Sequence, residues 1–152
     1  MHREIQYQCD TMNFNEVIKD AIELEESLYE LYISGVSAAE TSGAKLLFQK
    51  LADEELKHKK LLESVNPTLV SNFPETEYQL LQLHLQISSL KKLRFVKDIL
   101  HFASKKEAKA YNFYSGIVKK LPFGSMQGVF DKIAAEEQKH KNLVTSEFEK
   151  MR

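Results

Sequence analysis

The sequence predicts an all-α protein, a four-helix bundle with a long crossover between its second and third helices. Four segments carry apolar residues at the three- and four-residue spacing of an amphipathic helix. The first half of the chain also recurs 82 residues later, over a unit longer than one helix. Two similar hairpins, each with one apolar face, bury those faces best by packing against each other.

The first predicted helix follows a polar N-terminal arm over residues 1–12. Asn13 has the place of an N-cap and Glu16 that of the third helical position, which is the pattern of a capping box. The apolar face of this helix then runs to Val36, and one acidic residue, Glu25, interrupts it. Burying an unpaired charge is costly, so a carboxylate on such a face calls for an explanation.

The second predicted helix starts at Ser42, which is expected to cap it after the break at residues 40–43. Glu55 and His58 interrupt its apolar face. Residues 25 and 55 are each 15 positions from residue 40 (40 − 25 and 55 − 40). Because two antiparallel helices rise at the same rate on both sides of their turn, the two glutamates are expected to lie level and to face each other.

Residues 66–94 form the predicted crossover, because Pro67 and Pro74 end the second helix. Within it, residues 81–87 alternate apolar and polar in the manner of a strand, yet no other segment of the chain offers a strand partner. We therefore expect a short helix in this connection. His84 has no counterpart in the repeat and is expected at the surface or in an interface.

The third and fourth predicted helices, from about residue 95 onward, repeat the first two around a turn at residues 121–124. The repeat pairs each interrupting residue of the first half with one of the same type in the second half: Glu25 with Glu107, Glu55 with Glu137, and His58 with His140. Residues three apart on a helix share a face, so each Glu-x-x-His offers an oxygen and a nitrogen to one point.

Composition excludes several classes of protein. A chain of 152 residues suits one compact domain over residues 1–152, and 21 basic against 22 acidic residues give no net field to attract nucleic acid or an anionic membrane surface. No segment approaches the roughly 18 apolar residues of a membrane span. Cys9 is the one cysteine, so neither an internal disulfide nor a multi-cysteine metal site is possible, and we expect a cytoplasmic protein.

The six interrupting residues predict a metal site. Four carboxylates on core-facing stripes would each be strongly destabilising if they were buried, charged and unpaired. No lysine or arginine is expected on those stripes at their level, so divalent cations are the simplest compensation. The alternative is that the glutamates lie at the rim of the bundle and reach solvent.

With these motifs the chain resembles the rubrerythrin-like branch of the ferritin-like di-iron carboxylate proteins, over roughly residues 14–150. The resemblance implies a single ferritin-like domain with two iron ions, although manganese or zinc also suits such ligands. Carried over residue by residue, it implies six metal ligands: Glu25, Glu55, His58, Glu107, Glu137 and His140. By the same resemblance Glu55 and Glu137 would bridge the two metals.

Two tyrosines follow the glutamates of the first and third helices by seven residues, Tyr32 after Glu25 and Tyr114 after Glu107. Helical side chains lean toward the N-terminus, so each hydroxyl is within reach of a ligating carboxylate and able to donate a hydrogen bond to it. The alternative is that both are ordinary core tyrosines.

The chain departs from the family pattern in three ways. One cysteine cannot build a rubredoxin-type iron site, so electrons are expected from a separate donor protein. Ala110 stands where rubrerythrins carry an extra glutamate, which weakens a direct transfer of their peroxidase mechanism. Asp53 precedes the first Glu-Glu pair but Ala135 the second, so we expect no symmetric carboxylate orienting the histidines.

The function favoured by this reading is reduction of hydrogen peroxide or dioxygen at a dinuclear iron site. Ferroxidase activity in iron handling is an alternative for the same site. From another class, the chain is a metal-stabilised helical binding module without redox activity, with residues 80–93 as its contact surface. A homodimer formed through the crossover is the expected assembly.

Overall fold

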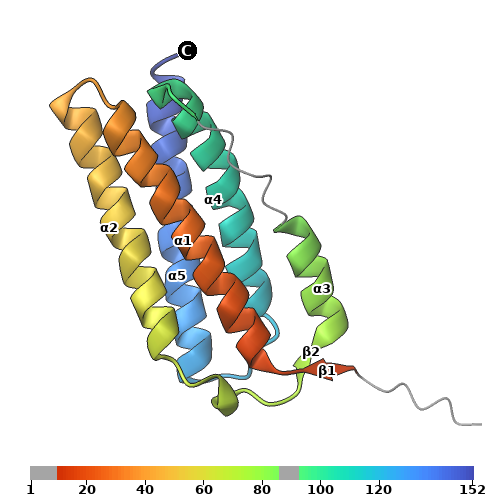
Figure 1. Cartoon of the computed structure of the whole chain (residues 1–152). Helices are drawn as coiled ribbons and strands as arrows, with labels where there is room; N and C mark the ends of the chain where they lie inside the picture. The colour runs from red at the N-terminus through yellow and green to blue at the C-terminus, as the bar shows by residue number, and fades with distance from the viewer. Residues whose placement is uncertain (1–9, 86–92) are drawn as a thin grey trace, which may run out of the picture.

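The computed structural model describes residues 10–85 and 93–152, and most of these residues are helical. Two long hairpins build the bundle (Figure 1): α1 (Phe14–Ala38) with α2 (Ser42–Ser64), and α4 (Val96–Val118) with α5 (Ser125–Glu149). The shorter α3 (Glu75–His84) lies in the connection between the hairpins, and α2 and α4 run in the same direction. The predicted all-α four-helix bundle with a long crossover is confirmed.

The N-termini of the first two helices are capped by side chains. Asn13 is the N-cap of α1, as expected, and its side-chain oxygen accepts from the Asn15 amide at 2.9 Å. The prediction that Ser42 caps α2 was wrong, because Thr41 takes that role and accepts from the Ala44 amide at 3.1 Å. The backbone of Thr41 is still extended, whereas Ser42 is already helical, and only an extended residue can cap.

The hairpins pack face to face with unequal spacing. The backbones of α1 and α4 approach each other closely, whereas those of α2 and α5 stay farther apart. Gly35 permits a close contact between the two helices of the first hairpin, because a Cβ atom there would lie 2.4 Å from the ring of Phe48. The buried core of both hairpins surrounds one level of polar side chains, described below.

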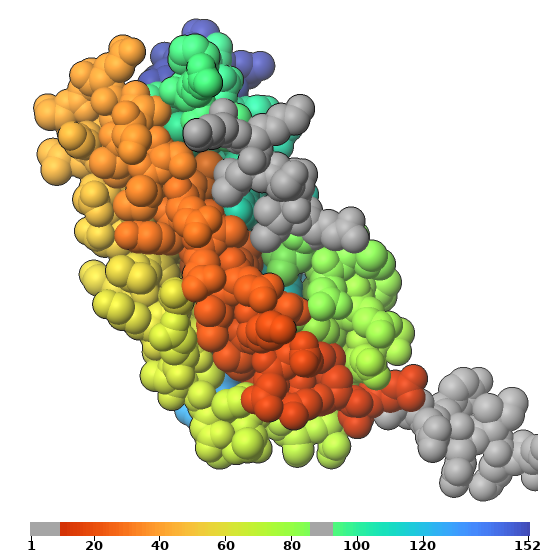
Figure 2. Space-filling model, viewed as in Figure 1, coloured from red at the N-terminus to blue at the C-terminus, as the bar shows by residue number. Residues whose placement is uncertain are grey.

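The connection between the hairpins contains the short helix expected for it. α3 packs along the outside of the bundle beside α4 (Figure 1), and Figure 2 shows it covering one flank next to α1. The Tyr78 hydroxyl and the Gln82 amide both donate to the Asp20 carboxylate on α1, the amide at 2.8 Å. His84 is exposed, in agreement with the prediction, and residues 86 and 87 of the alternating stretch lie outside the described residues.

One short pairing of strands was not predicted from the sequence. Two short strands, β1 (Thr11–Met12) and β2 (Phe73–Pro74), pair antiparallel at the start of the crossover. The Glu75 amide extends this pairing by donating to the Asp10 carbonyl at 3.0 Å. This pairing ties residues 10–12 of the predicted polar arm, just before α1, to the crossover. Residues 1–9 of the arm lie outside the described residues.

Candidate metal centre

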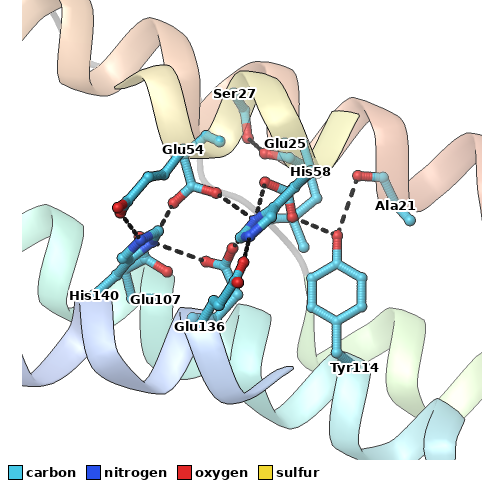
Figure 3. A network of polar contacts seen from close by, with 12 residues as sticks. Ala21, Glu25, Ser27, Glu54, His58, Glu107, Tyr114, Glu136 and His140 are labelled. Carbon is cyan, nitrogen blue, oxygen red and sulfur yellow. Dashed lines mark hydrogen bonds and ion pairs between the residues drawn. The ribbon is translucent and has the colours of Figure 1, made fainter. Parts of the chain in front are cut away.

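Six ionisable side chains from all four long helices meet in the interior of the bundle (Figure 3). The four carboxylates are fully buried and the two imidazoles are 3% and 4% exposed. These are the residues singled out by the repeat: Glu25 on α1, Glu55 and His58 on α2, Glu107 on α4, and Glu137 and His140 on α5. The alternative of a solvent-exposed rim position for the glutamates is therefore wrong.

The cluster forms two overlapping sets of four donors. In each set, one oxygen or nitrogen atom per residue lies within 4.8 Å of the others. One set comprises Glu25, Glu55, His58 and Glu137, and the other comprises Glu55, Glu107, Glu137 and His140. Glu55 and Glu137 belong to both sets, so their carboxylates occupy the position between the two points on which the donors converge.

Both imidazoles turn their Nδ1 atom toward the cluster. His58 Nδ1 lies 2.7 Å from Glu137 Oε1, and His140 Nδ1 lies 2.8 Å from Glu55 Oε1. The two rings are nearly parallel, with centroids 5.9 Å apart. Each histidine therefore offers Nδ1, not Nε2, to the centre of the bundle.

The Nε2 atoms are held by a second pair of glutamates that the sequence reasoning missed. Glu54 on α2 pairs with His140 Nε2 at 2.6 Å, and Glu136 on α5 pairs with His58 Nε2 (Figure 3). Each contact crosses from one hairpin to the other. The sequence does indicate these partners, because the dipeptides Glu54-Glu55 and Glu136-Glu137 recur at the 82-residue offset.

The expectation that no symmetric carboxylate orients the histidines was therefore wrong. It rested on Asp53, whose carboxylate instead accepts a hydrogen bond from Gln49 on the exposed side of α2. An aspartate one position earlier in the helix points about 100° away, so it cannot replace Glu54. A partner of this kind fixes the ring orientation and the tautomer of a metal-binding histidine.

Two tyrosine hydroxyls hold the remaining carboxylates. Tyr32 on α1 donates to Glu107 at 2.6 Å, and Tyr114 on α4 donates to Glu25 at 2.6 Å. Each hydroxyl thus reaches the glutamate of the opposite hairpin. Both tyrosines are fully buried, and burial followed by the nearby carboxylates raises their pKa well above the usual value, so they remain hydrogen-bond donors.

Without metal, protons supply the positive charge in the cluster. Burial, reinforced by the neighbouring charges of Glu107 and Glu25, raises the pKa of both Glu55 and Glu137. Burial alone would lower the pKa of His58, but contacts with Glu137 and Glu25 outweigh it and raise the value to about 11. The pKa of His140 is raised in the same way by Glu107 and Glu54.

One cation on the core stripes was not foreseen. Lys106 is 3% exposed and immediately precedes Glu107, although we had expected no lysine at this level. Its Nζ atom has no hydrogen-bond partner in the described structure, and burial lowers its pKa to about 8. The repeat places Leu24 at the equivalent position of α1, so Lys106 breaks the pseudo-symmetry of the site.

The donor set fits a pair of divalent cations. Four buried carboxylate oxygens, one each from Glu25 and Glu107 and both from Glu137, accept no well-directed hydrogen bond in the described structure; the nearest contact among them is the ion pair from His58 Nδ1 to Glu137 Oε1 at 2.7 Å. Oxygen atoms so placed are costly to bury unless they bind a cation. With neutral histidines, the four negative charges of the glutamates equal the charge of two divalent ions, and carboxylate with imidazole suits iron, manganese or zinc.

A comparison with protein-family models agrees with this site. The family model described as Rubrerythrin matches residues 98–152, which cover most of α4 and all of α5. The matched segment contains Glu107, Glu137 and His140. No curated protein and no solved structure shows a significant match to the chain.

The first hairpin lies outside the matched segment, and the internal repeat connects the two. Shifting residues 98–152 back by the 82-residue offset gives residues 16–70, which contain Glu25, Glu55 and His58. Both hairpins bring their donors to one level of the bundle, as in proteins that bind a dinuclear centre between four helices. The match of residues 98–152 to the Rubrerythrin family model and the four-helix architecture are together consistent with a ferritin-like protein of the rubrerythrin-like family.

Proposed function

We propose that the protein is a non-haem di-iron carboxylate oxidoreductase that reduces hydrogen peroxide or dioxygen. The observation that carries this proposal is the pair of overlapping donor sets, which share Glu55 and Glu137 in a fully buried setting. Two bound iron ions would supply two electrons to an oxygen–oxygen bond. A structural metal site needs no shared carboxylates and no second ion, so the arrangement favours redox chemistry over a purely stabilising role.

The residues of the chain would hold the ions and control protons around them. Glu54 and Glu136 keep the imidazoles turned so that Nδ1 faces inward and the Nε2 proton is donated outward. Tyr32 and Tyr114 fix one oxygen of Glu107 and of Glu25, which leaves the second oxygen of each available to an ion. The buried setting keeps bulk water away from the reacting oxygen atoms.

The net reaction requires an external source of electrons. Reduction of hydrogen peroxide to two water molecules consumes two electrons and two protons. We propose that a separate electron-donor protein supplies the electrons, that the protein acts in the cytoplasm, and that it works as a homodimer formed through the crossover. The described helices contain none long and apolar enough to cross a membrane.

Anaerobic loading with ferrous ion tests the proposal. We expect two ions per chain, followed by rapid oxidation of both on addition of one equivalent of peroxide, recorded by absorbance. Glu55→Ala and Glu137→Ala should each abolish binding of the pair, whereas Glu23→Ala, at an exposed position of α1, should not change it. Two ions bound without any oxidation would favour a binding module, and unchanged stoichiometry in both site variants would refute the assignment of the ligands.

A further inference from the structure

A groove of about 590 Å³ lies between α2 and α5, directly outside the two histidines. It exists because these two helices stay farther apart than α1 and α4 do. Its lining residues form five pairs, each with one member on either helix and 82 positions between the two. The groove therefore shares the pseudo-twofold symmetry of the metal-binding cluster beneath it.

Four lysines stand along the two walls of this groove: Lys50 and Lys57 on α2, and Lys132 and Lys139 on α5. All four are exposed, and none forms an ion pair with a residue of the described ranges. Elsewhere on α2, Lys59 is paired with Glu26 at 2.7 Å. In a chain with a formal net charge of −1, the groove thus carries a local excess of positive charge, four lysines against two glutamates that are themselves bound to histidines.

The floor of the groove belongs to the cluster itself. His58 and His140 line it, together with Glu54 and Glu136, the carboxylates that hold their Nε2 atoms. These two glutamates are about one-third exposed, with side-chain values of 34% and 36%. A molecule bound in the groove would therefore contact the glutamates that are hydrogen-bonded to the two histidines of the cluster.

The charges of the groove favour an anionic protein over other ligands. Lysines on both walls repel an approaching cation. A small anion finds no free imidazole donor, because both Nε2 atoms are already bound to carboxylates. A nucleic acid requires an extended basic surface, whereas the sequence pI is near 6.5 and α1 exposes Glu23, Glu26 and Glu30. A compact acidic surface matches four lysines confined to one groove.

We infer that this groove is the docking site for the acidic face of a one-electron carrier protein. The inference rests on the proposed function, because it assigns to the groove the electron donor that the reaction needs. Each docked carrier would give up one electron and leave oxidised. Two such encounters, with two protons, supply what reduction of one peroxide molecule to two waters consumes.

Binding is tested on the full-length protein without metal, so that this arm is independent of turnover. The probe is a fluorescein-labelled peptide of ten glutamates, measured by anisotropy at low ionic strength. Reversing the four lysines (Lys50→Glu, Lys57→Glu, Lys132→Glu, Lys139→Glu) should weaken binding at least about tenfold. A matched control reverses four exposed lysines away from the groove, Lys19, Lys45, Lys97 and Lys105, and should retain wild-type affinity.

Two further measurements keep the binding test decisive. A second groove variant with the four lysines changed to glutamine should fall between wild type and the reversed variant, and circular dichroism verifies that both are folded. A labelled single strand of ten thymidines is measured in parallel. Equal loss of peptide binding in the groove and control variants would overturn the inference, and so would tighter, groove-dependent binding of the oligonucleotide.

Electron delivery is tested on the iron-loaded protein with peroxide and a reduced acidic plant-type ferredoxin. Oxidation of the ferredoxin should slow about tenfold in the reversed groove variant and remain unchanged in the control variant. Oxidation of a small reductant that is uncharged at pH 7, hydroquinone, should be the same in all three proteins. If hydroquinone supports no turnover in any of them, the proposed function fails while the peptide result still decides the docking site. If ferredoxin oxidation does not depend on the groove, the docking inference fails.

Discussion

The hydrogen bond from Tyr114 to Glu25 gives a sharp test of how the buried cluster is held together. Replacing Tyr114 with phenylalanine removes a hydroxyl that donates at 2.6 Å to a fully buried carboxylate, while the aromatic ring and its packing are kept. Both oxygens of Glu25 would then lack a donor, because Oε2 already accepts no hydrogen bond.

The expected loss follows from the type of bond. A hydrogen bond to a charged group contributes about 1.5–3 kcal/mol, so Tyr114→Phe should lower the free energy of unfolding of the metal-free protein by about 2 kcal/mol. For a chain of this size, that corresponds to a fall in Tm of roughly 4–8 °C. The same change should weaken metal binding by about 10- to 100-fold, as is usual when a hydrogen-bond partner of a ligand is removed.

The chain supplies its own control for this experiment. Tyr111 lies on the same helix and packs against the core, but its hydroxyl has no hydrogen-bond partner among the described residues. Tyr111→Phe should therefore change stability by less than about 0.5 kcal/mol. Thermal unfolding of both variants by circular dichroism compares them directly, and an equal small effect in the two would refute a stabilising role for the hydroxyl of Tyr114.

Three further predictions concern charge in the interior. Lys106→Leu, which copies Leu24 of the first hairpin, should raise the free energy of unfolding of the metal-free protein by about 2 kcal/mol, because it removes a buried amine that has no hydrogen-bond partner in the described structure. Urea unfolding measures the change, and Lys105→Leu on the surface is the control. The pKa of His58 rises from 6.5 to about 11, so its stabilising contribution is complete below pH 6.5 and is lost toward pH 11. In urea unfolding of the metal-free protein, the contribution of His58 to the free energy of unfolding should fall by about 1 kcal/mol per pH unit between pH 6.5 and 8. His58→Gln should remove this pH dependence. Loading two divalent ions at pH 7 should release at least two protons, one from each imidazole, into a weakly buffered indicator solution, and uptake of metal without proton release would contradict the protonated state of the histidines.

It was predictable that the buried residues lie at one height in the bundle, because that height depends only on the number of residues between each of them and its turn. Glu25 and Glu55 lie equally far from their turn, and the second half repeats the arrangement 82 residues later. Helical rise is nearly constant, so equal counts give equal heights whatever the surrounding side chains are. The same reasoning placed Tyr32 and Tyr114 within reach of carboxylates, but it did not say that each would bind the glutamate of the other hairpin.

Features that depend on the neighbouring helix were not predictable from periodicity. Within α2 alone, Glu54 looks like an ordinary polar residue at the edge of the apolar face. Its role as the partner of His140 appears only once α5 packs against α2. Lys106 has a polar side chain, yet the packing of the hairpins leaves it only 3% exposed. Residues 81–84 alternate apolar and polar like a strand and nevertheless end the helix α3, which packs beside α4, so the alternation alone does not decide their conformation.

The cross-hairpin contacts of the cluster also determine when it can assemble. The four bonds made by the tyrosines and the outer glutamates join residues 75, 78, 86 and 89 positions apart. Contacts between such distant residues form late, because the chain must first close long loops, whereas each helical hairpin forms from local contacts. A bound metal pair would consequently stabilise the native state but not the transition state of folding. It would slow unfolding many-fold and leave the refolding rate nearly unchanged.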